Sequence, residues 1–177
     1  MTANPVYDSI LTRRSVRHYR PELPAKADLE KIVEAGLYAA SGKGGQSTLI
    51  VAVTDRALRN RLMEMNRRIG GWAEGFDPFY GAPAVLIVLA KKDSPYVVQD
   101  GSLCMGNLMQ AAHALGLGSC WINRAYEEFE SEEGKAILRE LGVEGEYTGV
   151  GHCIVGYPEG DAPKPAPRRE DRVVWAE

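Results

Sequence analysis

The sequence has no long apolar run and no excess of positive charge. Its 177 residues carry a net charge of −3, whereas nucleic-acid-binding domains usually carry a clear basic excess. No stretch of about 18 apolar residues occurs, so no membrane span is expected. The N-terminal residues 1–5 do not follow the basic-then-apolar pattern of a secretion signal. We therefore expect a cytoplasmic protein that binds neither nucleic acid nor membrane.

Cysteine and histidine are also scarce, with three of each. Cys104, Cys120 and Cys153 lie far apart beside apolar residues, and no Cys-x-x-Cys pair occurs. This pattern argues against a disulfide framework and against a zinc site, and it predicts buried thiols in a reducing cytoplasm. His152 lies within an apolar strand pattern, where we expect a core histidine rather than a metal ligand.

Several loops that mark common enzyme classes are missing. No Gly-x-Ser-x-Gly elbow is present to anchor a hydrolase triad. The glycine-rich loop at 42–45 follows a predicted helix and precedes a predicted strand, whereas Walker and Rossmann loops run from strand to helix. We interpret the acidic run 127–133 as a solvated loop that charges a helix N-terminus favourably. Since no side chain suits difficult chemistry, a cofactor is expected to carry it.

The chain is long enough for one domain with its own core, or for one that completes its core in a dimer. Alternating helices and strands predict layers of helix on both faces of one sheet, without fixing the strand directions. The helix expected at 98–115 is apolar nearly all round, which suggests that a second subunit covers part of it. Helices are predicted at 5–14, 26–40, 56–68, 98–115 and 131–141, strands at 49–54, 84–89, 119–122 and 148–157, an irregular aromatic loop at 70–81, and a strand-like segment at 172–175.

One segment combines several groups that suit an anion. Arg13, Arg14, Ser15 and Arg17 place three guanidinium groups and a hydroxyl within five residues. Guanidinium offers a planar fork of donors that matches a phosphate, so the segment predicts a phosphate clamp. The alternative is a solvated basic turn. Further groups that suit a flat anionic ligand are Arg168 and Arg169, then Ser41, Gly42 and Gln46, and the aromatic residues Trp72, Phe76, Phe79, Tyr80, Tyr126 and Phe129 of two loops.

Blocks of residues along nearly the whole chain resemble, in order, the FMN-dependent nitroreductase family. The resemblance implies an α+β fold, a homodimeric three-layer α/β/α sandwich with a central mixed or antiparallel sheet and two FMN sites at the subunit interface. It implies one domain over residues 1–177, whose C-terminal arm 158–177 packs on the partner subunit. The matching blocks are Arg13–Tyr19, Ala39–Gly42 with Gln46, Asn107-Leu108, Ala111-Ala112, Leu115–Ile122, and Val155–Pro158 with Arg168.

The resemblance also implies how the two ends of the chain bind FMN. Arg13, Arg14 and Ser15 match the segment that binds the flavin phosphate. Arg168 and Arg169 match a second phosphate contact near the C-terminus. Basic groups from both ends of the chain are therefore expected to converge on one anionic tail.

Three further matches concern the flavin ring. Arg17 matches a basic position that reaches the ring or the ribityl chain. The loop 41–46, with Ser41, Gly42 and Gln46, matches a loop donated by the partner subunit. Asn123 and Arg124 match the turn whose backbone N–H faces flavin N5.

The loop at 40–48 departs from the family pattern, which is commonly Pro-Ser-x-x-Asn-x-Gln-Pro-Trp. Ala40 replaces the first Pro, Gly44 the Asn, Ser47 the second Pro and Thr48 the Trp. One side-chain hydrogen bond to the flavin is thereby lost, and glycine loosens the loop. The expected result is weaker FMN binding or a ring that is held differently. The segment between 63 and 81 is also short, so the lid over the substrate is reduced or supplied by residues 72–80.

The activity that the resemblance implies is NAD(P)H-dependent reduction of a nitroaromatic, quinone or similar acceptor. Hydride would pass through flavin N5 in a ping-pong scheme, and no residue is assigned as a catalytic acid or base. Two alternatives stay open: another flavin reaction on the same scaffold, such as dehydrogenation or dehalogenation, and a flavin-binding protein with little turnover. The sequence does not choose between NADH and NADPH, nor does it identify the acceptor.

Overall fold

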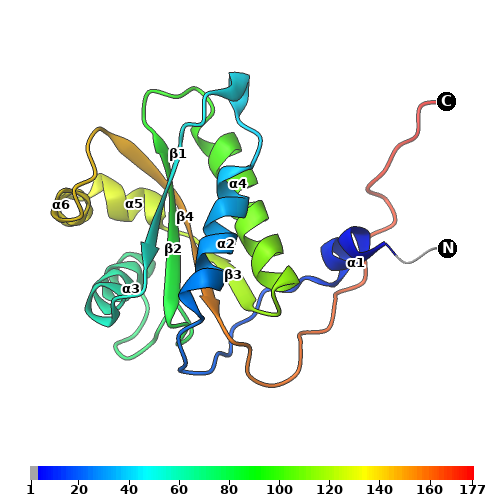
Figure 1. Cartoon of the computed structure of the whole chain (residues 1–177), viewed down its shortest axis with the longest axis horizontal. Coiled ribbons are helices and arrows are strands. Elements are labelled where there is room, and N and C mark those ends of the chain that lie inside the picture. Colours follow the sequence, from blue (N-terminus) through cyan, green and yellow to red (C-terminus); the bar gives the residue numbers. More distant parts are fainter. Residues whose placement is uncertain (1–3) are drawn as a thin grey trace.

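The computed structural model describes residues 4–177, and a four-stranded sheet forms its centre (Figure 1). All neighbouring strands are antiparallel, in the order β1-β2-β4-β3. This topology fixes the strand directions that the connections left open, and it confirms the expected α+β fold with an antiparallel sheet. The strands are β1 (Thr48–Val53), β2 (Ala84–Lys91), β3 (Gly118–Ile122) and β4 (Tyr147–Gly156).

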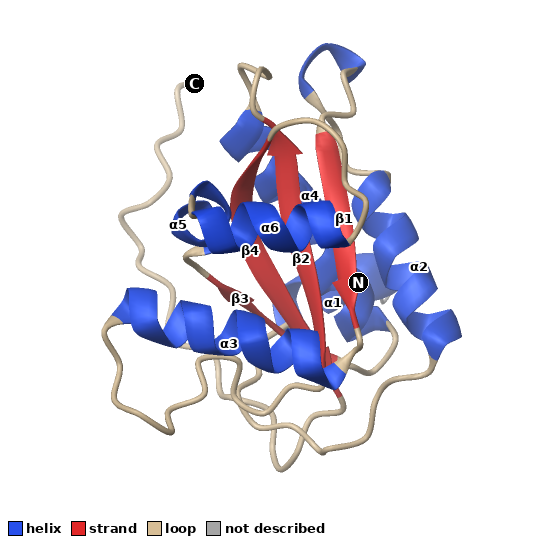
Figure 2. Cartoon of the chain, turned by 90° about the vertical axis from the view of Figure 1, so that its left-hand side faces the viewer, coloured by secondary structure: helices blue, strands red, loops and turns tan. Residues whose placement is uncertain are grey.

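Helices cover both faces of the sheet, which confirms the predicted three layers (Figures 1 and 2). In Figure 2, α3 and α6 cross in front of the strands, whereas α2 and α4 lie behind them. A further helix, α1, stands outside the layers and contacts α4. One face carries α2 (Lys26–Leu37) and α4 (Val97–Ala114), the other carries α3 (Arg56–Gly70), α5 (Ala125–Glu130) and α6 (Glu132–Glu140), and α1 spans Pro5–Thr12. No helix within residues 4–177 is long and apolar enough to cross a membrane.

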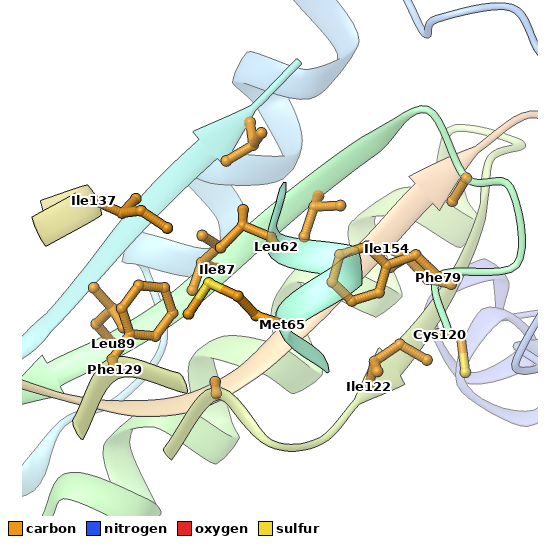
Figure 3. Packing of buried hydrophobic residues seen from close by; sticks show 14 of the residues in the cluster. Leu62, Met65, Phe79, Ile87, Leu89, Cys120, Ile122, Phe129, Ile137 and Ile154 are labelled. Atoms are coloured by element: carbon orange, nitrogen blue, oxygen red, sulfur yellow. The ribbon is translucent and has the colours of Figure 1, made fainter. Parts of the chain in front are cut away.

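Strand β2 is the centre of the core because its side chains alternate between the two faces of the sheet. Ile87 and Leu89 pack against α3, α5 and α6, as Figure 3 shows. Leu86 and Val88 pack against α2 and α4 on the opposite face. All four are fully buried. The unbroken apolar run at 84–89 is therefore the strand buried on both faces that the sequence predicts.

The helix starts follow local capping chemistry. Oδ1 of Asn4 accepts hydrogen bonds from the N–H groups of Val6 and Tyr7, both at 3.1 Å, and Oδ1 of Asp55 accepts one from the N–H of Leu58 at 2.8 Å. These side chains satisfy donors that have no partner inside the helix. The predicted starts at residues 5 and 56 are confirmed for this reason.

Two expectations for the segment after β3 are wrong. Residues 125–130 form helix α5 instead of a solvated acidic loop. Within it, Glu128 is fully buried and Phe129 is 1% exposed, so Phe129 is a core residue and not part of an exposed aromatic wall. The acidic run is misleading because tertiary contacts, described below, give the Glu128 carboxylate buried partners.

Two further corrections concern other loops. Phe79 was expected in an aromatic wall, but it is fully buried in the core beside Met65 and Ile154, as Figure 3 shows. Residues 172–175 do not form a strand, and Val174 and Trp175 are 95% and 81% exposed. A strand needs a sheet edge beside it, and the arm runs away from the sheet in Figure 1.

Large apolar side chains remain exposed on the helical side formed by α1, α2 and α4. Helix α1 contains no buried residue. On α4, Val98 and Leu103 are 66% and 51% exposed, and at the end of α2 Leu37 and Tyr38 are 55% and 82% exposed. An exposed apolar face of this kind marks an interaction surface.

Candidate functional site

The arginine segment is fixed to the edge of the sheet. The N–H of Val16 donates to the carbonyl of Ser119 in β3 at 3.0 Å, and the hydroxyl of Tyr19 donates to the carbonyl of Val16 at 2.7 Å. Gly118 permits this approach, since a Cβ there would lie 2.9 Å from the Val16 side chain. Residues 13–17 therefore lie along β3 with a defined backbone.

Arg13 provides the clearest sign of a position that can bind an anion. Its Nη1 is buried and has no hydrogen-bond partner among the described residues 4–177. A buried guanidinium donor without an acceptor is costly, so the position suits an anionic oxygen. Arg14 differs, because its Nη1 donates to the carbonyls of Leu11 and Arg13 at 2.8 and 2.7 Å. Its remaining donors are not used by those two bonds.

His113, at the end of α4, shows that this region is electropositive. Its Nε2 lies 2.9 Å from Oγ1 of Thr12. Burial, and then the positive charges of Arg13 and Arg14, lower the pKa of His113 from its ordinary value of 6.5. A cleft of about 280 Å³ lies here, lined by Arg14 and His113 together with the first residues of the C-terminal arm. The region suits a phosphate. A larger cleft of about 390 Å³, beside α6, contains none of the predicted arginines, and Phe129 is the one candidate aromatic residue in its lining.

Two more arginines meet the aromatic loop at 70–81. The guanidinium carbon of Arg124 lies 4.3 Å from the centre of the Trp72 ring, and that of Arg17 lies 5.8 Å from the Tyr80 ring. Phe76 connects the two rings, with centroid distances of 5.1 and 6.1 Å. Such cation–π contacts are weak when exposed and stronger when desolvated. Three of the expected aromatic residues thus lie together, in contact with two predicted site arginines.

The turn at Asn123 and Arg124 has an unusual backbone. Arg124 has φ of +81°, in the left-handed region that few residues other than glycine adopt. The side-chain Nδ2 of Asn66, on α3, donates to the carbonyl of Asn123 at 2.8 Å. Asn66 was missed by the sequence analysis, although it is a polar residue within the apolar stripe of its helix. That interruption of the stripe is the signal that could have identified it.

The glycine-rich loop is fixed by a buried carboxylate that was also missed. Asp100, 3% exposed in the first turn of α4, accepts from the N–H of Gly42 at 2.8 Å and from the hydroxyl of Ser47 at 2.7 Å. Oγ of Ser41 accepts from the N–H of Gln46 at 3.0 Å, and Gln46 is exposed at φ of +46°. Ser47, one of the departures from the family pattern, therefore joins the loop to the first turn of α4.

The structure separates the predicted site residues into two groups at opposite ends of α4. The loop with Ser41, Gly42 and Gln46 joins α4 at Asp100, whereas Arg13 and Arg14 lie near His113. His113 lies thirteen residues after Asp100 in the helix, a rise of about 20 Å. Within one chain these groups do not form one site.

Arg168 and Arg169 are likewise not brought to the arginine segment in the single chain. Both are exposed in the C-terminal arm. Nη2 of Arg168 donates to the carbonyl of Ala166, two residues away, at 2.8 Å. Within residues 4–177, no hydrogen bond or ion pair joins either arginine to residues 13–17, so their predicted role stays a prediction.

The three cysteines are buried and free, as expected. Burial raises the pKa of the Cys104 thiol to about 11 and raises that of Cys153 as well. Thiols of this kind are poor nucleophiles. The histidine expected in the core, His152, is fully buried.

Known proteins are similar to this chain over most of its length. The sequence model of the Nitroreductase family matches residues 10–157. A protein of Archaeoglobus fulgidus named "Putative NADH dehydrogenase/NAD(P)H nitroreductase" is 30% identical over 155 residues, covering 85% of this chain and 83% of the relative. An iodotyrosine deiodinase of Thermotoga neapolitana is 26% identical over 187 residues, covering 96% of each.

A solved structure agrees with these sequence relatives. The crystal structure of a nitroreductase with bound FMN from Bacteroides fragilis matches with a TM-score of 0.91 and 29% identity, covering 99% of this chain and 100% of the other. Both matches span the arginine segment, the sheet and the turn after β3. The chain belongs to the nitroreductase family.

Proposed function

We propose that this protein is an FMN-dependent oxidoreductase that takes electrons from NADH or NADPH. The observation that carries the proposal is the buried Nη1 of Arg13, which has no hydrogen-bond partner within residues 4–177. Arg14 and Ser15 follow it in the segment that lies along β3. This donor set fits the phosphate of FMN by charge and by hydrogen-bonding capacity. The FMN named for the Bacteroides fragilis structure and the NAD(P)H named for the archaeal relative support it.

Each part of the chain has a role in this proposal. Arg13, Arg14 and Ser15 bind the phosphate, and Arg168 with Arg169 supplies a second contact to it. Arg17 lies near enough to the aromatic loop to place positive charge at the flavin ring. Bound FMN would provide the redox chemistry, which is hydride transfer from the nucleotide to a substrate. The chain contributes position, charge and exclusion of water, and solvent supplies protons.

The site is proposed to form between two subunits of a homodimer. The loop with Ser41, Gly42 and Gln46 lies at the far end of α4 from Arg13, so a partner's copy of the loop would complete the ring contacts. The exposed apolar side chains Val98 and Leu103 on α4 offer the surface for such an association. The C-terminal arm 158–177, with its exposed Trp175, would then pack on the partner. Buried free thiols suit the reducing cytoplasm that we propose as its location.

The acceptor proposed is a nitroaromatic, a quinone or a similar flat compound. The aromatic loop with Trp72, Phe76 and Tyr80 provides a wall against which a planar ring could pack. A second candidate is reductive dehalogenation, because the iodotyrosine deiodinase relative matches 96% of this chain.

One set of anaerobic measurements tests the function. The purified protein is expected to carry FMN and to lose flavin absorbance near about 450 nm when NADH or NADPH is added. Subsequent addition of a nitroaromatic or a quinone is expected to restore the absorbance. Flavin that is bound but not bleached by either nucleotide would indicate a binding protein with little turnover.

Dehalogenation, the second candidate, is distinguished from nitroaromatic or quinone reduction by its product. Protein reduced chemically with dithionite is mixed with 3-iodo-L-tyrosine, and iodide is measured. Stoichiometric iodide together with slow nitroaromatic reduction would favour dehalogenation. A protein that neither contains nor binds FMN would refute both.

A further inference from the structure

A buried polar network lies beneath the turn at Asn123 and Arg124. Asn66, Glu128 and His152 are all fully buried. Nδ2 of Asn66 donates to Oε1 of Glu128 at 2.6 Å and to the carbonyl of Asn123 at 2.8 Å. Nε2 of His152 lies 2.9 Å from Oε2 of Glu128. Burying a carboxylate is costly and is often less stable than an apolar replacement, so the network calls for an explanation beyond stability.

The members of the network come from three separate elements, two helices on one face of the sheet and a strand of the sheet itself. Asn66 is on α3, Glu128 on α5 and His152 on β4. The rings of Phe79 and Phe129 lie 5.3 and 6.4 Å from the His152 ring.

The network fixes the orientation of one peptide plane. In a trans peptide the C=O and the following N–H point in opposite directions, and the chain contains no cis peptide among residues 4–177. The Asn123 carbonyl points inward to Asn66, so the N–H of Arg124 points outward from the core. Within the described residues, no main-chain or side-chain acceptor is paired with that N–H.

The turn also has a strained residue that needs support. Arg124 adopts φ of +81°, a conformation that costs on the order of 1–3 kcal/mol and persists only where the surroundings impose it. The Asn66 bond holds the peptide from below, and the Trp72 ring packs 4.3 Å from the guanidinium carbon. Such strain is typical of backbone that presents a group to a ligand.

We infer that Asn66, held by Glu128, is a positioning residue that aims the Arg124 N–H at the N5 acceptor of the flavin. The inference rests on the proposed function and deepens it. Asn66 does not touch the cofactor, and Glu128 acts only by holding the Asn66 amide. His152 lies beside the other carboxylate oxygen of Glu128.

The test compares FMN with 5-deaza-FMN, in which C5–H replaces N5 and removes this one acceptor. We expect the wild-type protein to bind 5-deaza-FMN roughly 5- to 10-fold more weakly than oxidised FMN, as the loss of one hydrogen bond requires. The ratio of the two dissociation constants reports on the N5 contact alone. Changes in folding or in phosphate binding affect both ligands equally and cancel.

The variant is the exchange Asn66→Asp with Glu128→Gln. It keeps one amide and one carboxylate in the buried network. The amide at position 128 can then donate to the carboxylate at position 66, the reverse of the wild-type hydrogen bond. The exchange removes the donor to the Asn123 carbonyl. We expect the ratio to fall to about 1. Asn66→Ala, which adds no charge, is the second variant and is expected to give the same ratio.

Asn107→Asp is the matched control. Nδ2 of Asn107 also donates to a main-chain carbonyl, that of Ala35, at 2.9 Å, but between α4 and α2. It is expected to keep the wild-type ratio. Variants at Asn66 that keep the wild-type ratio would overturn the inference.

The failure of this inference differs from failure of the proposed function. A wild-type protein that binds FMN and 5-deaza-FMN equally well would overturn the inference and leave the function standing. A wild-type protein that binds neither would overturn the proposed function, and the inference with it.

Discussion

A single buried nitrogen on Arg13 distinguishes a binding segment from a basic turn. Three guanidinium groups within five residues are compatible with both, and only the burial of Nη1 without a partner favours the first. Solvated arginines satisfy their donors with water, whereas a buried donor needs an acceptor. The backbone of the segment is fixed to β3 through Val16, so Arg13 holds a defined position at the edge of the sheet.

Replacing Arg13 tests this directly. Arg13→Ala is expected to weaken FMN binding roughly 10- to 100-fold, because a charge-assisted hydrogen bond is lost. Combined with Arg168→Ala, it is expected to give colourless protein on purification. The measurement is fluorescence titration of FMN. Arg20→Ala, exposed and further along the same segment, is the control, and full FMN occupancy in the double variant would refute the clamp.

His113 predicts a dependence of stability on pH. Its pKa is lowered in the folded protein below the ordinary 6.5, so the unfolded chain binds more protons as the pH falls through 6.5. The free energy of unfolding therefore falls as the pH drops from 6.5 toward the lower pKa of the folded protein. Above pH 6.5 the imidazole has no such effect. Lowering the pH from 7.5 to 5 is expected to destabilise the wild type more than His113→Gln.

Urea unfolding of cofactor-free protein at the two pH values gives this comparison. Arg13→Ala removes one of the positive charges that lower the pKa of His113. Its loss of stability between pH 7.5 and 5 is therefore expected to lie between that of the wild type and that of His113→Gln. Equal pH dependence in wild type and His113→Gln would show that the imidazole does not contribute.

At the scale of elements, the loop between α2 and β1 shows how a departure from a family pattern can be compensated. Ser47 stands where the family commonly has Pro, and its hydroxyl donates to the buried Asp100 carboxylate. A proline has no hydroxyl and stiffens the loop through its ring. In this protein the hydrogen bond from Ser47 to the first turn of α4 restrains the loop instead. The N–H of Gly42 donates to the same carboxylate.

Ser47→Ala is expected to lower the free energy of unfolding by about 1–3 kcal/mol, because one oxygen of a buried carboxylate loses its partner. Chemical denaturation without FMN measures this. Ser102→Ala, half-buried on the same helix as Asp100, is the control and is expected to change stability by less than about 0.5 kcal/mol. An equally small effect at Ser47 would contradict the anchoring role.

At the scale of the molecule, the two halves of the predicted site lie at opposite ends of α4. Helix geometry makes this separation unavoidable, since α4 is straight in Figure 1 and places Asp100 and His113 about 20 Å apart. A shared site between two subunits removes the difficulty. The apolar side chains exposed on α2 and α4 lie on the side of the sheet opposite α3, α5 and α6.

Leu103→Glu is expected to convert a dimer to monomers and to lose bound FMN, because a charge replaces an apolar contact on α4. Analytical ultracentrifugation and the ratio of flavin to protein absorbance measure both effects. Leu141→Glu, at an equally exposed leucine after α6, is the control and is expected to leave both unchanged. A wild-type protein that is monomeric at micromolar concentration would refute the shared site.

The sequence by itself determined the elements whose signals are local. The Asn4 and Asp55 caps, the apolar run of β2 and the helical stripe of α2 specify their structures through neighbouring residues, and the observed bounds agree to within a few residues. The family resemblance added the layered α+β fold. The candidate residues of segment 13–17 and of the turn after β3 also came from the sequence.

Only the tertiary structure decided the antiparallel order of the strands and the supports beneath the site. Glu128 looked solvated because its neighbours in sequence are acidic, yet its partners Asn66 and His152 are 62 and 24 residues away. Asp100 meets Gly42 across 58 residues. Burial and pairing of this kind depend on which elements pack together, and a pattern of adjacent residues carries no information about partners that distant.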